Sequence, residues 1–373
     1  MSMNSMKLSP TKQLLIIGNG FDKHLGLKSL YVEYYLSLTD NERKNNIFTY
    51  LASNKNYNWA DVEALLLKCL IIIKKLDAQT VKNYISAYKS DSKEQILSLL
   101  VSSNKSQKIM TILEEKELIK RVLKFFFLSS LIFPDSLLEF CQEPAHIFQK
   151  KLMDLMMDQV KNFESGFKDY LTNEIKNFPE ATYNIKSQKF IDKLIKSGVY
   201  NTNEYCNFIL SFNYTHLPNS TDFFNSRGGN NVHGTLLDNI ILGIDHHDYQ
   251  EFMEFTKTFR IMTELPQEPL KIYDNSIDII KFYGHSLGEA DYSYFVSIFD
   301  AFNIYNSDIV LKFYYDDFDC RSHKKEQVER VYKLINHYGE TFDNKDHGQN
   351  LLHKLVLEKR IYVLKMEDDV CYS

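Results

Sequence analysis

The sequence predicts an α/β protein with a mostly parallel sheet that helices cover on both faces. Short apolar runs alternate with helical segments after about residue 200, and one earlier apolar run ends in a glycine turn. The long stretch between them shows helical spacing. We therefore expect one α/β domain, residues 10–38 and 200–373, interrupted after its first strand by a helical insertion, residues 39–199.

The first predicted strand is "QLLIIGNG" at residues 13–20. Its apolar, β-branched run is typical of a buried strand, and Gly18 and Gly20 favour a sharp turn into a helix. Such a turn lets the backbone approach a phosphate closely. The dinucleotide fingerprint G-x-G-x-x-G is not matched, because Lys23 holds its last position. A tight turn without a ligand is the alternative interpretation.

The insertion is predicted to be helical. Apolar residues run along "WADVEALLLKCLIIIKKL" (59–76) and recur every three or four positions in 144–175. The most apolar segment, 122–133, is shorter than the about 20 residues of a membrane-spanning helix, so we expect a buried helix there.

The second part of the chain alternates predicted strands with helices. The strands are expected at 207–214, 230–234, 239–244, 277–284, 308–315 and 360–366, with helices at 289–302 and 324–339. Open parallel sheets bind ligands beyond the carboxyl ends of their strands. Each motif considered below lies at such an end.

Composition predicts an ordinary soluble protein. The 373 residues are 44% hydrophobic and 25% charged, and the net charge of −5 gives no support for nucleic-acid binding. The five cysteines are widely spaced, which favours a reduced cytosolic setting over disulfides or a zinc site. The start of the chain has no secretory signal, so we expect a cytoplasmic protein with no membrane or metal partner.

Two polar motifs follow predicted strands. In "SFNYTH" (211–216), Asn213 offers a donor and an acceptor that can orient a water or a sugar hydroxyl. In "NNVHGTL" (230–236), the ordinary pKa of His233 suits proton transfer near neutral pH. Structural roles stay open for both, since asparagine often ends strands and lone histidines are commonly structural.

The motif "GHSLG" matches the G-x-S-x-G turn of serine hydrolases at Ser286. Few residues follow it, however, and Glu289 and Asp291 place acids where an oxyanion would need backbone amides. These acids suit a helix N-terminus instead, with Asp291 as an N-cap.

Together the motifs resemble the AbiH family of bacteriophage abortive-infection proteins. The matching pieces are "LLIIGNGFD", "WADVE", "SFNYT", "VHG", "ILGID" and "YGHSLGEADYSYF", between about residues 14 and 315. The resemblance implies an anti-phage effector. A phage-derived trigger and a homo-oligomer are consistent with this role, and the sequence identifies neither.

AbiH proteins in turn are similar to sirtuin-like NAD-binding domains, which implies a sirtuin-like/Rossmann-type sheet with a nucleotide pocket. Two departures from the sirtuin pattern are Thr215, in place of an aspartate, and Asp22, in place of a serine. The implied catalytic residues are Asn213 and His233. The implied ligand-binding residues are Gly18, Asn19, Gly20, Phe21, Asp22, Thr215, Gly284, His285 and Ser286.

By this resemblance, the expected activity is hydrolysis of NAD to nicotinamide and ADP-ribose, which would deplete an infected cell. Asn213 would orient the water or the ribose hydroxyl, and His233 would act as a base or position the ribose. Another nucleotide as the ligand, a non-catalytic nucleotide sensor or partner subunit, and a serine hydrolase are the alternatives.

Overall fold

The computed structural model divides the chain into two compact units. The sheet unit comprises Met1–Ser29, Tyr170–Ile241 and Asp245–Ser373, and the helical unit comprises Leu30–Asp169 and Leu242–Ile244. Within them, the structure describes residues 11–52, 62–89, 109–128, 143–178, 180–198, 205–216, 230–245, 250–265, 277–317 and 323–366.

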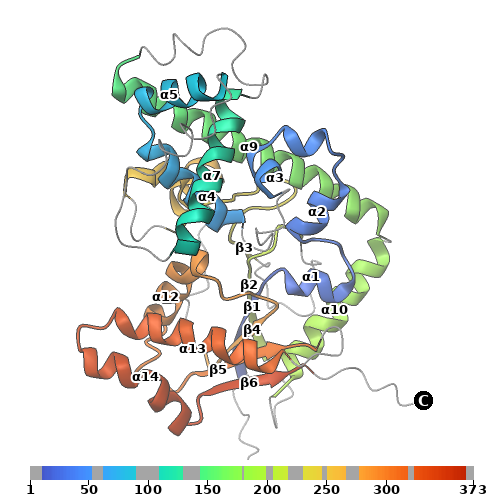
Figure 1. Ribbon diagram of the computed structural model, residues 1–373. Helices are drawn as coiled ribbons and strands as arrows, with labels where there is room; N and C mark the ends of the chain where they lie inside the picture. Colours follow the sequence, from blue (N-terminus) through green and yellow to red (C-terminus); the bar gives the residue numbers. More distant parts are fainter. Residues whose placement is uncertain are drawn as a thin grey trace, which may run out of the picture. The chain divides into compact units, whose positions relative to one another are not determined.

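The sheet has the strand order of Rossmann-type folds (Figure 1). Its strands are β1 (Thr11–Ile17), β2 (Tyr205–Ser211), β3 (Asn230–Asn231), β4 (Ile279–Tyr283), β5 (Val310–Tyr315) and β6 (Ile361–Lys365). They lie in the order β3-β2-β1-β4-β5-β6, and each pairing is parallel. The α/β, mostly parallel fold class is confirmed. The order reverses between β1 and β4, where such sheets bind ligands.

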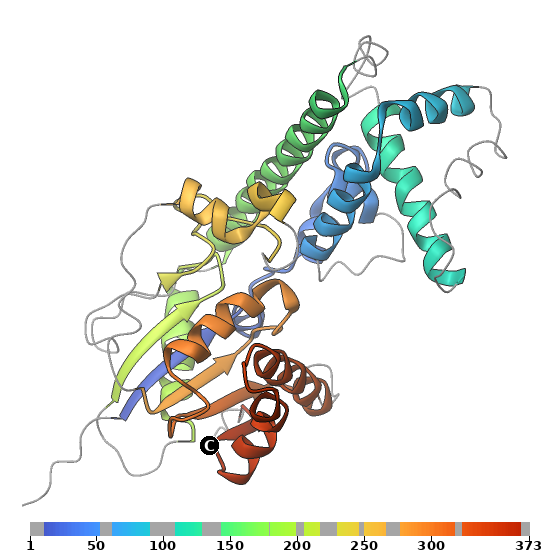
Figure 2. The same ribbon diagram turned by 90° about the vertical axis from the view of Figure 1, so that its left-hand side faces the viewer.

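Alternation along the buried strands builds a core on each face of the sheet. In β1, Leu14 and Ile16 join one core, and Leu15 and Ile17 join the other. Figure 2 shows the orange and red helices of the first core beside the sheet. The first core contains α12 (Tyr292–Ala301), α13 (Lys324–Glu340) and α14 (Lys345–Leu357), and the second contains α1 (Gly20–Leu25) and α10 (Glu180–Lys196).

The remaining helices of the sheet unit are short. They are η2 (Gln250–Phe255), α11 (Lys257–Glu264) and η4 (Glu289–Asp291). The last of these leads directly into α12, and α11 begins after Thr256, whose side chain accepts a hydrogen bond from the Phe259 amide.

The helical unit packs around aromatic side chains. Phe163 on its longest helix lies 5.5 Å from the Tyr34 ring and 5.4 Å from the Phe48 ring, between ring centroids. Arg121 donates to the backbone carbonyls of Tyr50 and Leu51, which ties two helices together. The helices are α2 (Tyr31–Ser37), η1 (Glu42–Lys44), α3 (Ile47–Ala52), α4 (Val62–Lys75), α5 (Ala78–Lys89), α7 (Ile109–Leu128) and α9 (Ala145–Asn177), with the end of α9 in the sheet unit.

The predicted strand at 239–244 is wrong. The chain turns at Gly234, which has a φ of 85° and forms an isolated antiparallel bridge with Ile240, and Ile244 is a further isolated bridge residue. The apolar residues that suggested a strand are buried without a ladder, and the amide of Leu242 donates to the Glu164 carboxylate. A buried apolar run of this length does not distinguish a strand from an irregular core segment.

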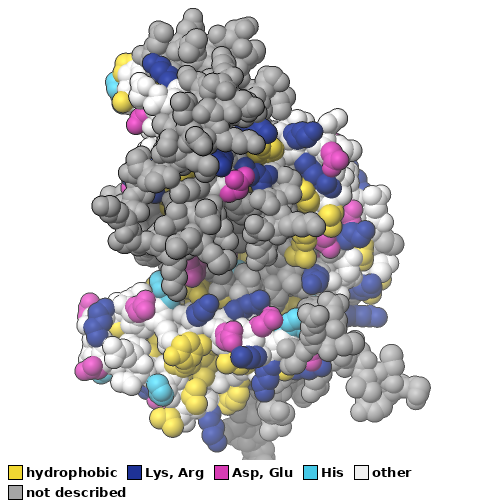
Figure 3. Space-filling model, in the orientation of Figure 1, with side chains coloured by type: hydrophobic (Ala, Val, Ile, Leu, Met, Phe, Trp, Pro, Cys, Tyr) yellow, Lys and Arg dark blue, Asp and Glu magenta, His cyan; other side chains and the backbone are white. Residues whose placement is uncertain are grey.

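The surface over α13 and α14 mixes charges with hydrophobic side chains (Figure 3). Val328 and Tyr332 are exposed on α13, and Val356 and Leu357 on α14. Across the described parts of the chain, no helix combines the length and the apolarity that crossing a membrane requires. In those same parts, no group of three or more histidine, cysteine or acidic side chains could hold a metal ion.

A buried lysine fastens α10 to the sheet. Lys281, in the centre of β4, is fully buried, and its Nζ donates to the carbonyl oxygens of Leu194, Ile195 and Ser197, each at 2.8 Å. These carbonyls belong to the C-terminal end of a helix, where they have no intrahelical partner and where positive charge is favourable. Gln13 Nε2 also donates to the Ile195 carbonyl and the Tyr314 hydroxyl to the Ser197 carbonyl, so Lys281 is the centre of a shared hydrogen-bond network at this helix end.

We expect Lys281→Met to lower the free energy of unfolding by about 2 kcal/mol or more, because three buried carbonyls lose a donor and only those of Ile195 and Ser197 keep a second one, from Gln13 and Tyr314. Urea denaturation measures the change. Lys196→Met is the matched control, since it removes an exposed lysine paired with Asp192 at the same helix end, and it should change stability by at most about 1 kcal/mol. Equal effects of the two substitutions would contradict this role for Lys281.

Candidate functional site

The turns after β1 and β4 are joined backbone to backbone at the point where the strand order reverses. The amide of Gly18 donates to the carbonyl of Tyr283 at 2.9 Å, and that of Gly20 to the carbonyl of Gly284 at 2.7 Å. A Cβ on Gly20 would lie 2.7 Å from the Gly284 Cα, and Gly284 has a φ of 70°. These glycines are thus required by the contact between the two turns.

Two residues of the first turn direct their side chains away from a ligand. The Asn19 amide exchanges two hydrogen bonds with Ser29, one through the serine backbone and one through its hydroxyl. Phe21 is fully buried and packs edge-on against Phe190, with ring centroids 5.7 Å apart. Only the backbone of Asn19 and Phe21 could therefore face a nucleotide.

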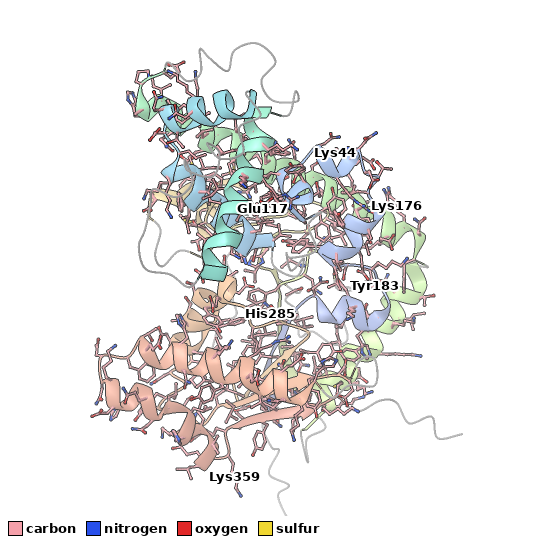
Figure 4. The ribbon with its side chains drawn as sticks, viewed as in Figure 1. Lys44, Glu117, Lys176, Tyr183, His285 and Lys359 are labelled. Carbon is pink, nitrogen blue, oxygen red and sulfur yellow. The ribbon has the colours of Figure 1, made fainter. Side chains whose placement is uncertain are left out.

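Asp22 links three elements of the sheet unit. It is 1% exposed, and its two oxygens accept hydrogen bonds from the Tyr183 hydroxyl at 2.6 Å and the Thr215 hydroxyl at 2.8 Å. Figure 4 labels Tyr183, which comes from α10. Burial raises the pKa of Asp22 to about 6, although both hydroxyls partly oppose the rise. The two departures from the sirtuin pattern, Asp22 and Thr215, thus contact each other.

Asn213 is buried with an unsatisfied side chain. It is 3% exposed, and neither its Oδ1 nor its Nδ2 has a hydrogen-bond partner within the described part of the chain. Its backbone is held, because Asn231 donates to the carbonyls of Asn213 and Thr215 at 2.5 and 3.0 Å. A buried amide without partners is rare in folded proteins, so this side chain is poised to bind a ligand or a water.

His233 and His285 converge on one carboxylate. The Nε2 atom of His233 lies 3.5 Å from Asp291 Oδ1, and that of His285 lies 3.4 Å from Asp291 Oδ2. The Phe212 ring lies edge-on to both imidazoles, at centroid distances of 5.4 and 4.6 Å. Figure 4 labels His285, which follows β4. The motifs after β2, β3 and β4 therefore meet around Asp291.

A lysine completes this cluster. Lys257, the first residue of α11, is 2% exposed, and its Nζ lies 2.7 Å from Asp291 Oδ1. Burial and the charge of Lys257 lower the pKa of His233 to about 3, against the opposing effect of Asp291. Burial alone would raise the pKa of Asp291, but Lys257 and the two histidines hold it well below its usual range. At neutral pH, His233 is an uncharged imidazole. It lies beside the ionised Asp291 carboxylate, whose negative charge is offset by Lys257.

Ser286 lies in the same turn but is exposed, and no hydrogen bond to a histidine reaches it in the described segments. The strained residue of this turn is Leu287, with a φ of 52°, whereas a hydrolase turn places the strain at the serine itself. His285 Nδ1 is taken by the amide of Leu287 at 2.9 Å.

Asp291 occupies the N-cap position of α12, as expected, but its side chain makes no capping hydrogen bond. The carboxylate of Asp245 binds the Ser293 amide in its place, at 2.9 Å. The expected capping role fails because Lys257 and the histidines engage Asp291 instead.

Three residues of this region were not predicted as site residues: Lys257, Asp291 and Tyr183. Lys257 and Tyr183 lie on helices without any motif, so only the folded chain brings them to the strand ends. Asp291 carried a signal, because it lies within a motif and is an acid five residues after Ser286. Of the "WADVE" motif, residues 59–61, including Trp59, lie outside the described residues.

Comparison with known proteins gives one match. A family model described as "Bacteriophage abortive infection AbiH" matches residues 14–313, well over half of the chain. No curated protein and no solved structure shows a significant match to the chain.

Asp22→Asn tests the buried carboxylate. The folded-state pKa of Asp22 is about 6, above its ordinary value of 3.8, so its contribution to stability is full below the ordinary pKa and is lost as the pH rises through 6. An amide carries no charge, so the free energy of unfolding of Asp22→Asn relative to the parent protein should rise by about 2 kcal/mol between pH 4.5 and pH 8. Chemical denaturation of both proteins at the two pH values measures this gain.

Asp192→Asn, at the half-exposed Lys196 pair on α10, is the control and should show no such pH-dependent gain. If Asp22→Asn and the parent protein differed in stability by the same amount at both pH values, ionisation of Asp22 would not destabilise the folded state.

Proposed function

The chain belongs to the AbiH family of bacteriophage abortive infection, and we propose that it acts there as an effector that binds a nucleotide and cleaves NAD. The observation that carries this proposal is the buried Asn213 amide, whose Oδ1 and Nδ2 lack partners among the described residues. It follows β2 on the edge where parallel sheets bind ligands, and it lies in one loop with Thr215.

Several residues of the site suit parts of such a ligand. The unsatisfied Asn213 amide can donate to and accept from a ribose hydroxyl or a water. The exposed Ser286 hydroxyl can donate to a phosphate oxygen. The glycine turn offers backbone only, since the side chains of Asn19 and Phe21 are engaged elsewhere.

The proposed reaction is hydrolysis. Water forms a carbon–oxygen bond to the ribose as the carbon–nitrogen bond to nicotinamide breaks, and one proton is released. Asn213 orients the attacking water. The low pKa of His233 favours the positioning role over the role of a base at neutral pH, because a group with a pKa of about 3 is a weak proton acceptor.

A nucleotide sensor without turnover is the second candidate. The partners of the two buried carboxylates favour it. Asp22 accepts hydrogen bonds from two hydroxyls, and Asp291 is paired with Lys257. The described site thus presents no unengaged carboxylate to activate water. A serine hydrolase is disfavoured by the exposed Ser286, which has no described histidine partner.

Incubating the purified full chain with NAD, with and without an extract of phage-infected cells, tests the proposal. Nicotinamide release separated by chromatography would support NAD cleavage. Tight nucleotide binding by calorimetry without release would favour the sensor, and labelling of Ser286 by a fluorophosphonate probe would favour the hydrolase.

Asn213→Ala should lower nicotinamide release by about 100-fold or more, because the water or ribose loses its orienting amide. Its stability should stay within about 1 kcal/mol of the parent protein, because the lost packing is offset by removing an unpaired buried amide. Asn231→Ala is the contrasting variant. It removes hydrogen bonds that hold the loop backbone, so both stability and turnover should fall. A large stability loss for Asn213→Ala would mark this amide as structural.

A further inference from the structure

The buried pair of Lys257 and Asp291 has no role in the function proposed above. The Lys257 Nζ donates to Asp291 Oδ1 at 2.7 Å and to the carbonyl of Ala290 at 3.1 Å. Both residues are buried. Placing an ion pair in the interior carries a desolvation penalty that its mutual attraction often fails to offset, so a stabilising role alone is a weak explanation.

The geometry ties this pair to the two imidazoles. Asp291 Oδ1, which binds Lys257, also faces His233 Nε2 at 3.5 Å, and Oδ2 faces His285 Nε2 at 3.4 Å. Because His285 Nδ1 accepts the Leu287 amide hydrogen, its neutral form carries the proton on Nε2, directed at Asp291. One carboxylate thus faces two rings: it is hydrogen-bonded to His285, whereas His233 Nε2 lies beside it without a hydrogen-bond partner in the described part of the chain.

The charges of the buried Lys257–Asp291 pair balance each other, so a neutral His233 adds no charge to the site. The other titratable groups that face the pair are His233, His285 and the Tyr294 hydroxyl on α12, and the Tyr294 ring lies 5.4 Å from that of His233, between centroids. Protonating His233 would add a positive charge to a buried site, which is unfavourable.

We propose that Asp291 positions His233 while Lys257 offsets the charge of that carboxylate, so that the buried imidazole stays uncharged and meets the ribose of the bound nucleotide as a neutral hydrogen-bonding group. Lys257 and Asp291 are positioning residues in this role, which rests on the nucleotide site proposed above. The low pKa of His233, caused by burial and by Lys257, agrees with it.

A neutral ring matters for the proposed reaction. Positive charge develops on the ribose as nicotinamide leaves, and an imidazolium within a few ångströms would repel it. Asp291 without Lys257 would favour that imidazolium, because a carboxylate raises the pKa of an adjacent histidine. Lys257 removes this tendency by neutralising the carboxylate first.

Lys257→Met tests the proposal. It removes the lysine charge from the Asp291 carboxylate beside His233, so the His233 pKa should rise by about one unit or more. Histidine side-chain NMR of the full-length protein, titrated from about pH 2.5 to 8 so that the range includes a pKa of about 3, measures the shift and needs no turnover. Lys257→Gln keeps a donor for Asp291 without the charge and should give the same direction, should the methionine variant fail to fold.

Two further variants act as controls. Lys365→Met removes a lysine from a partly exposed pair at a comparable distance, 2.8 Å from Asp317, which lies after β5. It should leave the His233 pKa unchanged. The double variant Lys257→Met/Asp291→Asn contains neither charge and should return the His233 pKa to the low value of the parent protein.

An unchanged His233 pKa in both Lys257 variants, or an equal shift in Lys365→Met, would overturn the proposal. If the His233 pKa shifted as expected but NAD were not cleaved, the proposed reaction would be rejected. The effect of Lys257 and Asp291 on His233 would still be supported.

Discussion

The close approach of the turns after β1 and β4 is the constraint on which the candidate site depends. Hydrogen bonds from Gly18 and Gly20 to Tyr283 and Gly284 fix the two turns where the strand order reverses. This contact places His285, which follows β4, beside Phe212, which follows β2 on the other side of β1. The glycines of this protein therefore serve the meeting of two backbones, and the polar chemistry is supplied by residues around them.

Much of the fold was predictable from the sequence, because buried parallel strands give apolar runs and their ends carry glycine or polar residues. The sequence predicted five strands to within a few residues at each end: β1, β2, β4, β5 and β6. The strand predicted at 239–244 is absent, because burial of an irregular segment produces the same apolar pattern. Sequence order also placed the motifs at one edge of the sheet, since all of them follow strands.

The polar contacts within the site were not predictable. Lys257 is three residues from the buried Arg260 on a short helix, and nothing in that spacing distinguishes a buried lysine from a solvated one. Tyr183 reaches Asp22 across 161 positions of sequence. The unsatisfied state of Asn213 is likewise a property of the folded interior, because its motif is equally typical of a strand end that bonds its own backbone.

Lys281 has a consequence for chemical labelling of the native protein. Its amine is enclosed by three carbonyls at the end of α10 and is fully buried, so acylating reagents that modify exposed lysines cannot reach it while the helix is docked. Acylation at this one amine then requires α10 to detach from β4. The rate of that modification, measured by peptide mass spectrometry, therefore reports how often this part of the sheet unit opens locally.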